Sequence, residues 1–153
     1  MTAQRTEELY YNDDIYKMAS EPLRPYLESL RNPIEFVYPS TACWRGYCGT
    51  WEIRDDKLYL IKLRGFIYER REVDINYVFP GEPIVFANWF SGEIMLPMGN
   101  LLYYIHAGYE SVYEQDLFLE FESGILKSSR TVDNFERAKL LIEEEKKHEN
   151  GWF

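Results

Sequence analysis

Apolar and polar residues alternate along the middle of the chain, and this pattern predicts a series of β-strands. Over residues 47–54, a period of two places Tyr47, Trp51 and Ile53 on one face. We therefore expect Trp51 to anchor the first long strand in the core. Later apolar runs predict further strands over residues 58–67, 84–90, 93–96 and 101–107.

Two hairpins are expected, one on each side of this region. The first covers residues 8–19 and turns at the acidic pair Asp13-Asp14. The second covers residues 117–130 and turns at Ser123-Gly124, a two-residue loop whose glycine matches the twist of paired strands. Because hairpins join neighbouring strands antiparallel, we expect a largely antiparallel sheet.

Helices are expected near both ends of the chain. Pro25 suits the first position of a short helix, which ends by Asn32. Asp133, followed three residues later by Glu136, is typical of the start of the second helix, and Gly151 suits its end.

Two segments interrupt the strand pattern. Residues 73–79 are compatible with either a strand or a single helical turn. Residues 97–100, which contain proline and glycine, predict a break between strands.

No linker, repeat or change of composition divides the chain, so we predict a single globular domain over residues 1–153. The expected fold class is α+β. A mainly antiparallel sheet would form two packed sheets or a partly open barrel, with a short N-terminal helix and a C-terminal helix. Either arrangement would cover the edges of so many strands.

Charge narrows the classes of partner. The net charge is −9, with 26 acidic residues, so nucleic acid and anionic membranes are not expected partners.

No apolar run approaches the roughly 20 residues of a membrane span. The N-terminal stretch also lacks the apolar region of a secretory signal. A cytoplasmic location is therefore expected.

Candidate metal and cofactor ligands are few. Cys43 and Cys48 form one pair without a second, and His106 and His148 are the only histidines. No glycine-rich phosphate loop occurs. We expect neither a metal nor another cofactor, and free thiols rather than a disulfide, since a reducing compartment keeps thiols reduced.

Aromatic residues make up 17% of the chain, and several lie near polar side chains that could bind a ligand. If the strands pair, these residues could meet at one concave, aromatic-lined site. The alternative is an ordinary aromatic core, with Arg45 on a ring or beside a carboxylate. The candidate ligand-binding residues are Trp44, Arg45, Asn88, Trp89, His106 and Tyr109.

Four stretches, WRGYCGTWEI, KLYLIKL, VFANWFSGEI and DLFLEFESGILKS, resemble an uncharacterised family of small bacterial proteins. The resemblance covers most of residues 20–134 and implies a bacterial cytosolic origin, without an activity, ligand or catalytic residue. The tripeptide Gly49-Thr50-Trp51 also resembles the G-x-W that opens lipocalin barrels.

These observations favour a non-catalytic binding protein that acts through protein–protein contact or through an aromatic-lined pocket. An acidic surface suits a basic protein partner, as in bacterial immunity proteins. One alternative is a small enzyme that uses His106 with Glu110 or a cysteine. Another is a lipocalin-like carrier of a small apolar ligand. The oligomeric state is left open.

Overall fold

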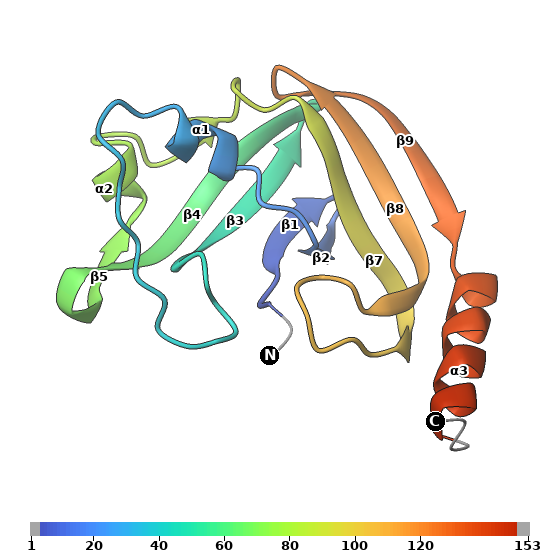
Figure 1. The fold of residues 1–153 in the computed structure, drawn as a ribbon. Helices are drawn as coiled ribbons and strands as arrows, with labels where there is room; N and C mark the ends of the chain where they lie inside the picture. The colour runs from blue at the N-terminus through green and yellow to red at the C-terminus, as the bar shows by residue number, and fades with distance from the viewer. Residues whose placement is uncertain (1–3, 150–153) are drawn as a thin grey trace.

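Nine strands pair into one sheet in the computed structural model, which describes residues 4–149 (Figure 1). Its order is β2-β1-β3-β4-β9-β8-β7, and β5 and β6 pair with β4 beside this path. The strands are β1 (Glu7–Tyr11), β2 (Asp14–Met18), β3 (Tyr47–Arg54), β4 (Lys57–Ile67), β5 (Arg71–Asp74), β6 (Val85–Phe86), β7 (Gly92–Tyr103), β8 (Val112–Glu122) and β9 (Ile125–Asp133). The helices are α1 (Arg24–Glu28), α2 (Ile75–Val78) and α3 (Phe135–Glu149), with a 3-10 turn at Tyr68–Arg70.

The sheet is mainly antiparallel, as predicted, and the α+β class is confirmed. β1 pairs parallel with β3, whereas the other described strand pairs are antiparallel. The chain crosses from β2 through α1 and a long irregular segment before it enters β3, which makes this parallel pair possible.

The sheet curves until its two terminal strands meet. Just after β2, the N–H of Ala19 donates to the carbonyl of Met95 in β7 at 2.9 Å, and the N–H of Met95 donates to Ser20 Oγ at 3.0 Å. On the opposite side, β4 and β9 pair where Lys57 faces Ile125. The two strands begin near each other at the top of Figure 1. This topology corresponds to a partly open barrel rather than to two packed sheets.

Apolar side chains fill the centre of the barrel. Trp51 is fully buried, so its predicted role as the inward anchor of β3 is confirmed. Close packing of this kind leaves little space between side chains. Other large, fully buried apolar side chains include Leu9, Met18, Pro22, Leu23, Leu58, Leu60, Ile94, Leu96, Val112 and Leu119.

The predicted break over residues 97–100 is wrong, because β7 continues through it with shifts in register after Met98. Pro97 pairs with Asp116 on the neighbouring β8. β7 is a terminal strand of the sheet, so one of its sides carries few ladder hydrogen bonds, and a missing N–H is tolerated there.

Three other segments differ from the expected strands. The strand expected over residues 101–107 ends with β7 at Tyr103. The strand expected over residues 84–90 is confined to Val85–Phe86. Residues 73–79 contain both expected alternatives, since β5 ends at Asp74 and α2 begins at Ile75. The carboxylate of Asp74 accepts a hydrogen bond from the N–H of Asn76, which stops the strand and starts the helix.

Both predicted hairpins are present. In the first, the turn lies at Asn12-Asp13, one residue earlier than predicted, and both residues have positive φ. In the second, Ser123 and Gly124 also have positive φ, as a tight two-residue turn requires.

Both predicted helices are present as well. α1 contains Pro25 in its first turn and ends at Glu28, before Asn32. The carboxylate of Asp133 accepts a hydrogen bond from the N–H of Phe135 at the start of α3. The expected stop at Gly151 lies outside the described residues. In the part of the chain that the structure describes, no helix combines the length and hydropathy that a membrane crossing needs.

Candidate functional site

A buried ion pair joins β1 to the segment just before β3. Glu7 is fully buried because β1 directs it inward together with Leu9. Its carboxylate accepts hydrogen bonds from Arg45 Nε at 3.2 Å and Trp51 Nε1 at 2.7 Å. A Cβ at position 49 would lie 2.6 Å from Glu7 Oε1, so Gly49 makes room for the carboxylate.

Arg45 connects this pair to a chain of polar contacts. Its side chain is only 4% exposed, and it donates to Tyr109 Oη at 3.1 Å and to Cys48 Sγ at 3.6 Å. The hydroxyl of Tyr109 donates to Glu21 at 2.8 Å, and Glu21 in turn pairs with Arg24 at the surface. We call these five residues the polar chain: Glu7, Arg45, Tyr109, Glu21 and Arg24.

Burial governs the protonation of Glu7. It raises the pKa of Glu7 from 4.5 to about 7, although Arg45, the Trp51 N–H and the backbone of Gly49 lower it. Burial lowers the pKa of Arg45, but the negative charge of Glu7 and further neighbours outweighs this, so the guanidinium remains charged. The carboxyl of Glu7 is therefore the member of this pair that titrates near neutral pH.

The neighbouring hydroxyl and thiol groups stay protonated. Burial raises the pKa of Tyr109 above its usual value, and it also raises the pKa of Cys48, with Glu7 adding to the effect. A protonated thiol is a weak nucleophile. These groups thus act as hydrogen-bond partners of Arg45.

An open pocket lies beside the polar chain, between α1 and the start of β3, with a volume of about 620 Å³. Apolar side chains form most of its walls, and its charged lining residues are two arginines and two glutamates. We call it the α1 pocket. Its lining residues are Arg24, Leu27, Glu28, Pro33, Ile34, Glu35, Phe36, Val37, Arg45 and Tyr47.

Two glycines hold one wall of the α1 pocket close to the sheet. Cβ atoms at Gly46 and Gly65 would lie 2.8 Å and 2.7 Å from Phe36 side-chain atoms, so larger residues would push Phe36 away. The N–H of Val37 also donates to the carbonyl of Phe66 at 2.8 Å. Consequently the ring of Phe36 packs on Tyr47, with a centroid distance of 5.1 Å.

The structure brings together two of the six candidate residues, Arg45 and Tyr109. Trp89 belongs to another aromatic cluster, where its ring packs on Tyr26 and Phe79 with centroids 4.9 Å and 5.7 Å away. The indole N–H of Trp89 donates to the carbonyl of Pro22 at 2.8 Å, which fixes the ring under α1.

The remaining three candidates, Trp44, Asn88 and His106, are exposed. The backbone N–H of Trp44 donates to the side chain of Gln4, and the His106 ring packs edge-on against Tyr104 at 4.3 Å. Within residues 4–149, no hydrogen bond joins His106 to a carboxylate or to a thiol.

Sequence reasoning missed Glu7, Glu21 and Phe36. A pattern could have pointed to Glu7, because it shares the inward face of β1 with Leu9. Phe36 lies in an irregular segment with no periodicity, and its position depends on contacts with Gly46 and with β4. Such contacts are not visible in a local pattern.

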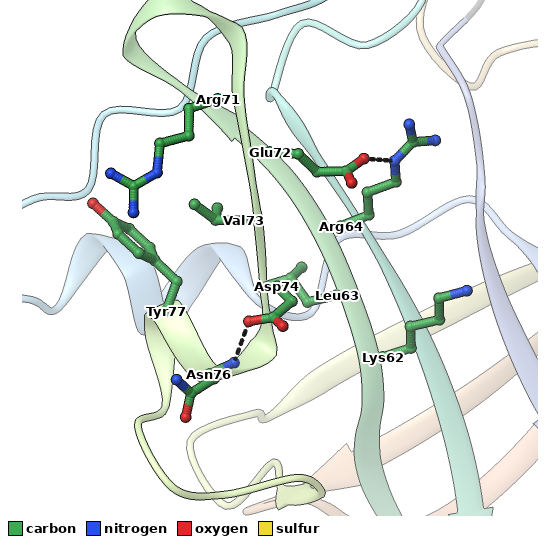
Figure 2. A pocket seen from close by; sticks show the side chains of 9 residues that line it. All are labelled: Lys62, Leu63, Arg64, Arg71, Glu72, Val73, Asp74, Asn76 and Tyr77. Carbon is green, nitrogen blue, oxygen red and sulfur yellow. Dashed lines mark hydrogen bonds and ion pairs between the residues drawn. The ribbon is translucent and has the colours of Figure 1, made fainter.

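A second hollow, beside β4 and β5, is polar (Figure 2). Its acidic side chains have partners within the hollow: Glu72 pairs with Arg64, and Asp74 accepts from the N–H of Asn76. Figure 2 shows Arg71 and Tyr77 on one side of the hollow and Lys62 and Arg64 on the other. It lacks the apolar walls of the α1 pocket, so we take the α1 pocket as the candidate site.

Metal ligands do not gather within residues 4–149, where no group of three His, Cys, Asp or Glu side chains is arranged to hold an ion. Cys43 and Cys48 are free thiols.

Comparisons with protein-family models, with curated proteins and with solved structures gave no match.

Proposed function

We propose that this chain is a non-catalytic binding protein, and that the α1 pocket binds a small ligand. The ligand would have an apolar body and one end that accepts hydrogen bonds, such as a carboxylate or a carbonyl. The observation that carries this proposal is Arg45, a buried cation that lines a pocket with largely apolar walls.

Arg45 is prepared for such a contact. A guanidinium has five N–H donors. Arg45 uses donors toward Glu7, Tyr109 and Cys48. The remaining donors suit an acceptor on a ligand. Because three partners already hold the side chain in place, binding would cost little of its conformational entropy.

The walls suit a flat or aromatic apolar group. Phe36 and Tyr47 present two rings tilted by 54°, and Leu27 and Ile34 add aliphatic surface. Burying an apolar group here gains roughly 25 cal/mol for each Å² removed from water. The apolar walls would supply affinity, and Arg45 would select the orientation.

Two alternatives receive less support from the geometry. An enzyme needs an activated nucleophile or base, whereas burial raises the pKa of Cys48 and the His106 ring is exposed beside Tyr104. A lipocalin-like carrier needs space inside the barrel, which Trp51 and its neighbours fill. A basic protein partner in a bacterial cytoplasm remains compatible with the net charge of −9.

Titration with 8-anilinonaphthalene-1-sulfonate tests the proposal, since this dye combines an aromatic body with an acceptor group. We expect one site with enhanced emission, and at least fivefold weaker binding in Ile34→Asp. The matched control is Ile142→Asp, on another apolar hollow beside α3. Far-UV circular dichroism checks that both variants fold. If Ile142→Asp lost dye binding and Ile34→Asp kept it, the proposal would be overturned.

A further inference from the structure

A third hollow, separate from the α1 pocket, is lined mainly by cations. Its volume is about 670 Å³, and its charged lining residues are Arg5, Lys17, Lys62, Arg64 and Glu8. Four cations thus face one carboxylate in a chain whose net charge is −9. We call it the basic hollow. It shares no lining residue with the α1 pocket.

The pairing register of β1 to β4 places several residues of the basic hollow side by side. Lys17 on β2 faces Glu8 on β1, Glu8 faces Thr50 on β3, and Thr50 faces Lys62 on β4. Residues opposite one another in paired strands have side chains on the same face. Two lysines and a hydroxyl therefore form a row across four strands, with Glu8 in between.

These cations are largely uncompensated. Within residues 4–149, Arg5, Lys17 and Lys62 form no ion pair, and Arg64 pairs with Glu72. Like charges that share a hollow repel each other, and an anion placed among them would relieve that repulsion. Lys62 and Arg64 line both the second hollow, beside β4 and β5, and the basic hollow. Figure 2 shows their side chains directed away from Arg71.

We propose that the basic hollow binds a small phosphorylated molecule that carries two or more negative charges. Lysine ammonium groups act as point charges for phosphate, and arginine can bind two of its oxygens at once. The hydroxyl of Thr50, which lies in the row between Lys17 and Lys62, adds a hydrogen-bond donor. The otherwise acidic surface repels long polyanions, which favours a compact ligand over nucleic acid.

Isothermal titration calorimetry with pyrophosphate at low ionic strength tests this assignment. We expect pyrophosphate to bind more tightly than inorganic phosphate, with affinity falling as salt rises. Lys17→Gln and Lys62→Gln should each weaken binding at least fivefold. The matched control is Lys127→Gln, an exposed lysine on β9 outside the hollow, which should bind as the unchanged protein does.

Three results would overturn the assignment. They are no binding at millimolar pyrophosphate, a loss of pyrophosphate affinity in Lys127→Gln equal to that in the other two variants, or tighter binding of duplex DNA than of pyrophosphate. The test is independent of the α1 pocket. Lys62→Gln should leave dye binding unchanged, and Ile34→Asp should leave pyrophosphate binding unchanged.

Discussion

Glu7 is a carboxyl group on the apolar face of a strand, and its neighbours compensate only part of the cost of burying it. Arg45 and Trp51 supply two hydrogen bonds, yet burial still raises the pKa of Glu7 to about 7. A pKa above the ordinary value means that the folded protein binds this proton more tightly than the unfolded chain does.

The free energy of unfolding should therefore depend on pH through Glu7. Its stabilising contribution is fully present below the ordinary pKa of 4.5 and is lost as pH rises to about 7. Glu7→Gln cannot ionise, so the stability of this variant relative to the unchanged protein should rise between pH 5 and pH 8, by on the order of 2 kcal/mol. Urea denaturation of both proteins at the two pH values measures this difference. A difference that does not change with pH would contradict the protonation assigned to Glu7.

Single residues also show which parts of the site the sequence predicts. Arg45 and Tyr109 stand out as a cation and an aromatic near apolar strands, and they meet although 64 positions separate them. Phe36 does not stand out, because its segment has no periodic pattern. The sequence predicts which face of a periodic strand a residue occupies. It does not predict where an irregular segment packs, because that depends on tertiary contacts.

At the scale of elements, the turn between β8 and β9 depends on Gly124. Its φ is +80°, and a Cβ there would lie 2.5 Å from the carbonyl oxygen of Ala87. Gly81 has a similar φ of +81° but open space around it. The hairpin prediction over residues 117–130 succeeds because a turn of this kind has a local sequence pattern.

Substituting these two glycines separates backbone strain from a steric clash. Gly81→Ala should lower the free energy of unfolding by about 1 kcal/mol, the cost of a left-handed alanine. Gly124→Ala adds the clash with Ala87 and should lower it by about 3 kcal/mol. Chemical denaturation compares the two variants. Equal losses would show that contact with Ala87 does not constrain the turn.

The start of α3 depends on the carboxylate of Asp133. Because this group accepts a hydrogen bond from the N–H of Phe135 at 2.9 Å, Asp133→Ala should lower the free energy of unfolding by about 1 kcal/mol. Asp133→Asn keeps the acceptor and serves as the control. Thermal denaturation followed by circular dichroism measures both. An unchanged midpoint in Asp133→Ala would contradict the role of this cap.

At the scale of the molecule, local patterns explain the correct predictions, and the curved sheet explains the incorrect one. The α+β class follows from hairpins and from strand periodicity, which are local. The continuity of β7 through Pro97 does not, because it depends on β7 being a terminal strand of the curved sheet. The polar chain likewise requires β1, the segment just before β3 and the loop of Tyr109 to meet.

Net charge acts on the whole molecule. A charge of −9 on a small protein destabilises the folded state through self-repulsion, which salt screens. The melting temperature should therefore rise by about 3 °C between low salt and 0.5 M sodium chloride, equivalent to roughly 1 kcal/mol for a chain of this size. Differential scanning calorimetry measures the shift. A melting temperature that falls with salt would show that attractive surface pairs dominate instead.

The most direct test of the α1 pocket is a ¹⁵N NMR titration with 8-anilinonaphthalene-1-sulfonate. If the pocket is the binding site, the largest shifts should occur at the N–H groups of residues 24, 26–28 and 34–37 and at the Nε–H of Arg45. Shifts concentrated instead along α3, at Ala138 and Ile142, would contradict the account.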